Sequence, residues 1–185
     1  MTFRWNMVAI LMLTLLAGPA ASERMKRPMK VHRVAEVGLE IWVEHTPRWT
    51  GELKKVRDKA VYVVSSPENN HPPVVMNYLT IPEAATIPRD EMKDVVSGAI
   101  RTAAANYGHR QPESVAVRPS RHGILEGYEA RFPGTVGGTK VDVQVFVGAA
   151  PGKPLVAMHV YTLRGKLDHI SENIRRAWDN VKYLD

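Results

Sequence analysis

The stretch KVDVQVFVG, residues 140–148, places a valine at every second position. Successive side chains of a strand point to opposite faces of a sheet, so this alternation predicts a strand with a continuous apolar face. Turns rich in glycine and proline at 133–138 and 149–154 separate the stretch from strand patterns at 124–132 and 155–164. Because short turns of this kind join antiparallel neighbours, we expect a meander of three antiparallel strands.

The remaining elements surround this meander. Apolar residues recur at intervals of three and four at 89–107 and again at 166–183, which predicts two amphipathic helices. Further strand patterns lie at 37–43, 60–65, 74–80 and 114–117. The order of strands, helix, meander and helix lacks the regular strand–helix alternation of a parallel sheet. The sequence therefore predicts an α+β fold, an antiparallel sheet flanked by helices.

The opening strand, VGLEIWV at 37–43, is followed by Pro47, Arg48 and Trp49 in the next turn. Similar short motifs are the strand opening GYEA at 127–130, the strand VYTL at 160–163 and a closing helix that contains Ile174 and Trp178. Together these motifs resemble the domain of the PsbP-like family over about 37–184, most of the chain. The resemblance implies an α/β/α sandwich. It also implies a binding role, since members of the family commonly act as accessory, assembly or chaperone-like proteins and share no catalytic residues.

The first 22 residues have the organisation of a secretory signal peptide. Arg4 precedes an apolar run at 7–17, and small residues follow that run up to Ser22. A helix needs about 20 apolar residues to cross a membrane, so this shorter run favours a cleaved signal over a permanent anchor. The small residues allow cleavage after Ala20 or after Ser22. We therefore expect the protein to be periplasmic or secreted.

Behind the signal at 1–22, the sequence predicts a basic N-terminal arm at 23–36 and a single domain at 37–185. The arm has the composition of a solvated tail, although an anionic membrane surface would also attract it. The chain has 185 residues and a net charge of +6 at pH 7, which fits one ordinary core and a modestly cationic surface. The absence of cysteine excludes disulfides, thiol catalysis and thiolate metal sites.

The sequence predicts no catalytic, cofactor-binding or metal-binding residue. Its seven histidines never show the paired spacing that a zinc hydrolase uses. The stretch GTVGGTK at 134–140 lacks the glycine spacing and the following helix of a phosphate loop, and is typical of a hairpin turn. His159 lies among apolar strand residues, which favours a place in the core or on a sheet face over a ligating role.

One group of side chains is a candidate anion-binding or partner-binding patch, namely Arg118, Arg121, His122 and Arg131. These residues bracket the turn before the meander, and gathered cations attract anions. A solvated surface is the alternative interpretation. Because no aromatic residues interleave with these cations and the protein is expected to be exported, we expect no nucleic-acid partner.

These observations predict an exported accessory or binding protein that acts through protein–protein contacts and has no catalysis of its own. Its partner would be an envelope or secretion-system protein. Two alternatives remain open. One is a small-ligand carrier or enzyme with a pocket between the sheet and the helix at 89–107. The other is a peripheral membrane protein held on an anionic membrane surface by the arm at 23–36.

Overall fold

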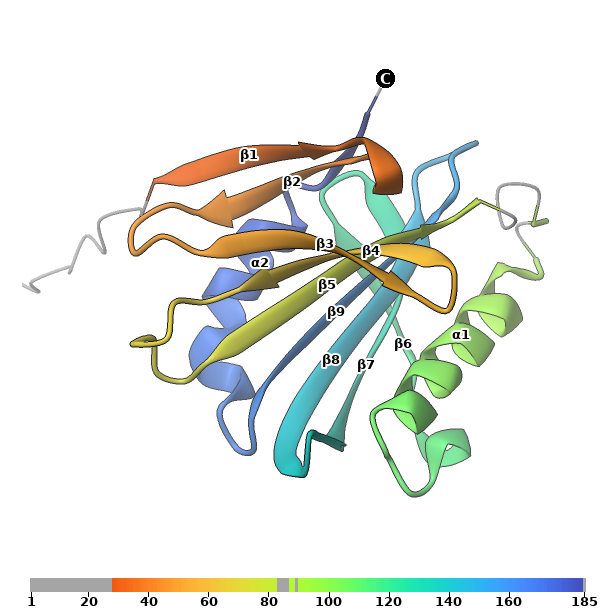
Figure 1. The fold of residues 1–185 in the computed structure, drawn as a ribbon. Helices are drawn as coiled ribbons and strands as arrows, with labels where there is room; N and C mark the ends of the chain where they lie inside the picture. The colour runs from red at the N-terminus through yellow and green to blue at the C-terminus, as the bar shows by residue number, and fades with distance from the viewer. Residues whose placement is uncertain (1–27, 83–86, 89, 185) are drawn as a thin grey trace, which may run out of the picture.

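The computed structural model describes residues 28–82, 87–88 and 90–184, and within them the strands form two antiparallel sheets (Figure 1). The large sheet has seven strands in the order β3-β4-β5-β9-β8-β7-β6, and the small sheet has three in the order β1-β2-β10. The strands of the large sheet are β3 (Thr50–Val56), β4 (Lys59–Ser65), β5 (Val74–Ile81), β6 (Arg118–His122), β7 (Leu125–Val136), β8 (Thr139–Ala149) and β9 (Leu155–Leu163). Those of the small sheet are β1 (Met29–Val34), β2 (Leu39–Glu44) and β10 (Lys182–Tyr183). The helices are α1 (Met92–Asn106) and α2 (Ser171–Trp178), with short 3₁₀ turns at Ala35–Val37, Pro112–Ser114 and Leu167–Ile170.

The predicted meander is confirmed as β7, β8 and β9, each paired antiparallel with the next. In β8 the alternating valines are buried, and Val143 and Val145 have no exposed surface. The opposite face of β8 is covered as well, because Gln144 and Phe146 are also buried. The meander is therefore the centre of the large sheet, with packing partners on both faces.

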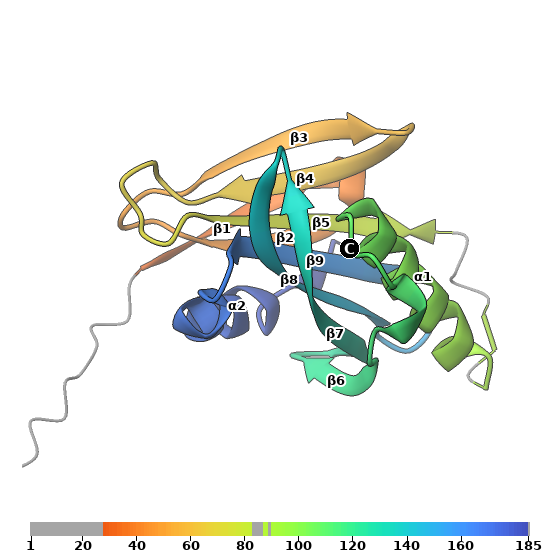
Figure 2. The same cartoon turned by 90° about the horizontal axis from the view of Figure 1, so that it is seen from below.

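Different elements cover the two faces of the large sheet (Figure 2). On one face, α1 packs through Val96 and Ile100 against the valines of β8. On the other face, α2 and the small sheet pack together around Trp178, whose side chain is fully buried. The predicted α+β fold with an antiparallel sheet between helices is thus confirmed.

The described part of the basic arm expected over 23–36 contains a strand and is not a solvated tail. Met29–Val34 form β1, which pairs along its whole length with β2. Val34 is buried against the core, while Arg33 points outward and forms an ion pair with Glu40 at 3.2 Å. Lysines and arginines are common on edge strands because they discourage further pairing, so a basic composition did not distinguish this strand from a tail. The signal predicted at 1–22 and residues 23–27 lie outside the described residues.

The closing helix expected over 166–183 is shorter than predicted. A 3₁₀ turn at Leu167–Ile170 leads into α2, which ends at Trp178, and β10 follows. The apolar stripe that predicted the helix is buried, but Tyr183 pairs with Leu39 of β2 and donates a hydrogen bond to Pro154 O at 2.6 Å. These contacts hold the last residues extended. Neither α2 nor any other helix in the described part of the chain is long and apolar enough to cross a membrane.

Two segments at the edges of the large sheet also differ from expectation. Every residue of β3 is exposed, so this edge strand carries no apolar pattern in the sequence. The strand expected at 114–117 is absent, because Pro112 begins a 3₁₀ turn at that point and β6 starts at Arg118. A proline fits the first position of a helical turn, which favours the turn over an extended chain.

We expect Trp178→Ala to lower the free energy of unfolding by about 3–5 kcal/mol, because it leaves a large cavity between α2 and both sheets. Urea unfolding followed by circular dichroism measures this loss. The control is Leu163→Ala, since Leu163 is 38% exposed and should cost far less. Equal effects of the two substitutions would show that α2 does not depend on Trp178.

Candidate functional site

A cavity of about 770 Å³ opens between the large sheet and α1. This volume lies within the range of about 300–1,000 Å³ that is usual for small-ligand sites. Strands β4, β5 and β9 supply its floor and α1 supplies a wall. The sequence left open a small-ligand carrier or enzyme with a pocket between the sheet and the helix expected at 89–107. The cavity lies in that place.

The cavity exists because α1 covers only part of its face of the sheet. The helix packs on β7 and β8, and the β3–β4 hairpin lies on its other side (Figure 1). The side chains that bound the gap are small where helix and sheet approach each other, namely Ala99 and Ala103 on α1 and Ala157 on β9. Since alanine fills little volume, the space between helix and hairpin stays open.

The lining is mostly apolar and carries positive charge at one end. Its apolar side chains are Val56, Val61, Val63, Leu79, Ile81, Ala99, Ala103, Val147 and Ala157. Its neutral polar side chains are Asn77, Thr102, Asn106, Tyr107, His159 and Tyr161. Its cations, Lys54, Arg57 and Lys59, all come from the β3–β4 hairpin, and the described lining contains no carboxylate.

A neutral polar group lies on the floor of the cavity. Asn77 and His159 face each other across β5 and β9, and Asn77 Nδ2 donates a hydrogen bond to Tyr107 Oη at 3.1 Å. The Tyr107 ring meets the His159 ring edge to face at 5.9 Å. Within the described residues no hydrogen bond to the His159 ring is present, and burial lowers the pKa of His159 to about 4. At neutral pH this imidazole is uncharged and can both donate and accept a hydrogen bond.

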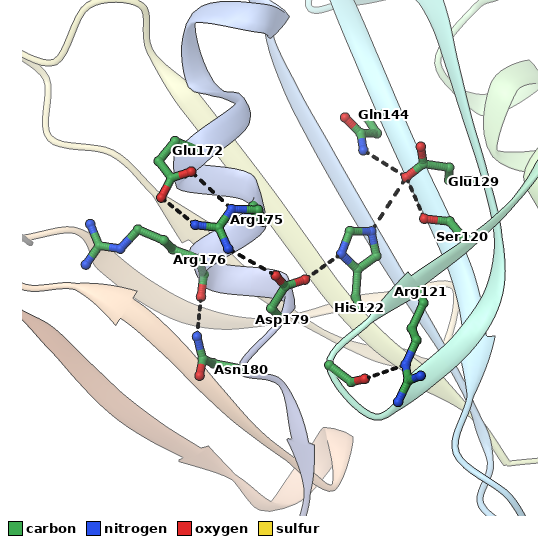
Figure 3. A network of polar contacts seen from close by, with 11 residues as sticks. Ser120, Arg121, His122, Glu129, Gln144, Glu172, Arg175, Arg176, Asp179 and Asn180 are labelled. Atoms are coloured by element: carbon green, nitrogen blue, oxygen red, sulfur yellow. Dashed lines mark hydrogen bonds and ion pairs between the residues drawn. The ribbon is translucent and has the colours of Figure 1, made fainter.

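A second polar cluster lies on the opposite face of the sheet, built around His122 (Figure 3). The Nδ1 atom of His122 is 3.0 Å from Asp179 Oδ1, and its Nε2 atom is 3.5 Å from Glu129 Oε2. The ring also meets the edges of Phe146 and Trp178 at 4.8 and 5.2 Å. We call His122, Glu129 and Asp179 the His122 cluster.

The charges of the His122 cluster are mutually stabilising. Burial by itself would lower the pKa of His122, but the carboxylates of Glu129 and Asp179 outweigh burial and raise it. The contact with His122 in turn lowers the pKa of Glu129. Because Asp179 follows α2 and Glu129 lies on β7, the cluster fastens the β6–β7 hairpin to the end of α2. Its arrangement is that of a structural contact with little open space around it.

The structure brings the residues of the predicted cationic patch together only in part, since Arg118, His122 and Arg131 share one face of the β6–β7 pair and Arg121 does not. Arg118 and His122 lie on one face of β6, while Arg121 points to the other face because side chains alternate along a strand. His122 is buried in its cluster. Arg131 Nη1 lies 3.1 Å from Asp168 Oδ1, so its charge is already paired. The described residues also contain no group of three histidine and acidic side chains placed to hold a metal ion.

The sequence placed His159 correctly on a sheet face but gave no sign that this face lines a cavity. The only sequence signal for open space is the run of small residues on α1, which includes Ala99 and Ala103. Alanine is also the strongest helix former, so this signal has an ordinary explanation. The sequence did not predict a cationic β3–β4 hairpin, because it did not predict β3 itself.

Solved structures of other proteins are similar to this chain in overall fold. No family model and no curated protein matches the sequence. The solution structure of cyanobacterial PsbP (CyanoP) from Synechocystis sp. PCC 6803 is similar with a TM-score of 0.55 and 13% identity, over 84% of this chain and 92% of that chain. A crystal structure from Bacteroides thetaiotaomicron VPI-5482 is similar with a TM-score of 0.52 and 8% identity, over 84% of this chain. This chain covers 48% of that protein, about half of its length. The chain therefore has the PsbP-like fold, and at these identities the likeness concerns the fold alone.

We expect stability to depend on pH through the His122 cluster. The pKa of His122 is raised above its ordinary 6.5, so its contribution is complete below about pH 6.5 and is lost as the pH rises through the raised value. The pKa of Glu129 is lowered from 4.5, so its contribution is lost as the pH falls. His122→Gln should therefore lower the free energy of unfolding by about 1.5–3 kcal/mol between these values and by less at pH 9.

Urea unfolding of the wild type and of His122→Gln at several pH values measures this difference. The control is His169→Gln, which changes an exposed histidine of the 3₁₀ turn before α2 and should match the wild type throughout. A difference between His122→Gln and the wild type that stays constant from pH 5 to pH 9 would show that His122 is not charged in the folded protein.

Proposed function

We propose that this protein is an exported, non-catalytic carrier that holds a small apolar ligand in the cavity between the large sheet and α1. The observation that carries the proposal is the cavity itself, about 770 Å³ in volume, in which valine, leucine, isoleucine and alanine make up half of the lining residues. The sequence favoured protein–protein contacts and kept a carrier as an alternative. A cavity of ligand size between sheet and helix favours the carrier.

The energetic argument for a ligand comes from the lining. Side chains such as Val61, Leu79 and Ala157 offer water no hydrogen bonds, so water gains little by filling the space between them. An alkyl chain in the same space would contribute about 0.8 kcal/mol for each methylene group removed from water. The cavity is therefore suited to a molecule with a large apolar part.

The chemistry of the lining supports binding without catalysis. Among the described lining residues there is no serine, cysteine or carboxylate. His159 thus has no carboxylate partner in the described lining to orient it, as the histidine of a catalytic triad requires. Its neutral ring can instead give a polar atom of a ligand a single hydrogen bond.

The predicted export of the protein supports a carrier function. The signal predicted at 1–22 would deliver the protein to the periplasm or the medium, where an apolar compound is insoluble on its own. A cavity with a largely apolar floor would move such a compound through water. Under this proposal the accessory role is transport or presentation of the ligand.

An accessory role through protein contacts is the second candidate, and one observation favours it. Strand β3 is a fully exposed edge of the large sheet, and Leu53 and Val56 on it are 44% and 52% exposed. An edge strand offers unpaired backbone groups to a partner chain. The partner would be an envelope or secretion-system protein, and cross-linking in the periplasm through position 53 is the experiment that would identify it.

Filling the cavity should abolish ligand binding. Ala99→Phe places a ring in the cavity from the wall formed by α1, and we expect it to weaken binding of the neutral fluorophore N-phenyl-1-naphthylamine by about tenfold or more. The measurement is fluorescence titration of the purified wild type and variant. Mass spectrometry of organic extracts from the two proteins should find a copurified apolar compound in the wild type only.

The matched control is Ala105→Phe, which adds the same ring to an exposed position of the same helix outside the cavity. It should bind the fluorophore as the wild type does. Thermal melting of all three proteins establishes that each is folded. Absence of binding by the folded wild type, or equal binding by Ala99→Phe, would refute the carrier function.

A further inference from the structure

The charge in the cavity is confined to one end. All the cations of the lining, Lys54, Arg57 and Lys59, belong to the β3–β4 hairpin, whereas α1, β5, β8 and β9 contribute only neutral side chains. Lys54 is opposite Val61, and Lys59 is opposite Val56, so both lysines share the face of the hairpin that looks into the cavity. Diagonal neighbours of this kind lie about 7–8 Å apart, within reach of long side chains.

The carboxylates of the hairpin cancel this charge only in part, because Glu52 shares the face of Lys54 and pairs with it, while Arg57 and Lys59 add further positive charge to the lining. Residues 50–65 carry four cations against two carboxylates, Glu52 and Asp58. Glu52 lies 2.5 Å from Lys54, and Asp58 lies 3.1 Å from Lys55, which points away from the cavity. Neither carboxylate lines the cavity. An excess of positive charge therefore remains where the hairpin meets the apolar floor.

The turn of the hairpin places one of these cations in an unusual position. Val56 pairs with Lys59, so the turn has two central residues, Arg57 and Asp58, with φ of 48° and 66°. Such left-handed positions favour glycine and asparagine. Here an arginine occupies the first of them and lines the cavity. An arginine head binds carboxylate and phosphate oxygens through several donors at once.

An apolar path leads away from the cationic end. Val61 on β4, Leu79 on β5, Ala157 on β9 and Val147 on β8 all line the cavity, and Ala157 is opposite both Leu79 and Val147. Beyond the hairpin the polar groups of the described floor are the neutral ring of His159, the amide of Asn77 and the hydroxyl of Tyr161. An ionised head group buried there would lose its hydration without gaining an opposite charge.

We infer that the ligand is an anionic amphiphile with one acyl chain, its head group bound by Arg57 at the β3–β4 hairpin, with Lys54 contributing as part of its ion pair with Glu52, and its chain lying along the apolar floor. This inference rests on the carrier function proposed above and specifies its ligand class. A free fatty acid and a lysophospholipid with a phosphate head share this chemistry.

The test compares ligands that differ only in the head group. Wild-type protein is titrated, below the micelle concentration, with palmitate, palmitoyl-lysophosphatidylglycerol and monopalmitoylglycerol, each competing with N-phenyl-1-naphthylamine. We expect one or both anionic ligands to bind about tenfold more tightly than the neutral monoacylglycerol, with a preference that weakens at high salt. The tighter of the two anions distinguishes a fatty acid from a phospholipid as the source.

Variants connect the preference to the hairpin. Arg57→Asn combined with Lys54→Gln removes two cations, and asparagine tolerates the left-handed turn, so the hairpin should stay folded. We expect this variant to bind the anionic ligand about tenfold more weakly and the monoacylglycerol as before. The control, Lys55→Gln, removes a cation from the opposite face of the same hairpin and should leave both affinities unchanged.

The outcomes separate the ligand class from the carrier function. Equal affinity of the wild type for the anionic and neutral lipids, or an unchanged preference in the double variant, would overturn the anionic class while the carrier function stands. Binding of glycerol phosphate as tight as that of the lysophospholipid would also overturn it, because the chain would then contribute nothing. Failure of every lipid and of the fluorophore to bind would refute the carrier function itself.

Discussion

The requirement to cover both faces of one wide sheet determines the arrangement of this molecule. Seven strands at a spacing of about 4.8 Å form a sheet roughly 29 Å wide, whereas a single helix with its side chains is about 10–12 Å across. On one face, α2 and the small sheet together provide enough surface. On the other face α1 stands alone over β7 and β8. The uncovered part of that face is the floor of the cavity, so the candidate site follows from the unequal cover of the sheet.

A histidine is buried on each face of the large sheet, and its surroundings shift its pKa in opposite directions on the two faces. His122 is buried between two carboxylates, which raise its pKa and favour the charged ring. His159 is buried among apolar and aromatic side chains with no carboxylate beside it, and its pKa falls to about 4. On the first face the charge is used to fasten a hairpin to α2. On the second face, the neutral His159 ring adds no charge to the floor of the cavity. Under the proposed function, the charge that selects a ligand therefore comes from the β3–β4 hairpin.

The sequence predicts those elements whose burial matches their periodicity. Residues 140–148 alternate because one face of β8 meets α1, and the helix at Met92–Asn106 shows its buried stripe for the same reason. Strand β3 has no buried face, so no pattern marks it. The cavity depends on which strands α1 does not cover, a matter of tertiary placement that local periodicity does not contain. The sequence shows that residues 54–59 contain lysines and an arginine. Only the register of β3 with β4 shows which of these cations face the cavity.

A PsbP-like fold is compatible with either a carrier or a protein-contact role, and the difference lies in a few side chains. Replacing Ala99 and Ala157 by leucine would fill space between α1 and the sheet without altering the order of the strands. The same fold would then present a solid face and an exposed edge strand. At 13% identity the likeness concerns the fold alone, which is why the neighbouring structures specify the architecture and not the ligand. Under the proposed carrier function, the choice of ligand is set by the cavity lining, where small residues on the helix and cations on one hairpin occur together.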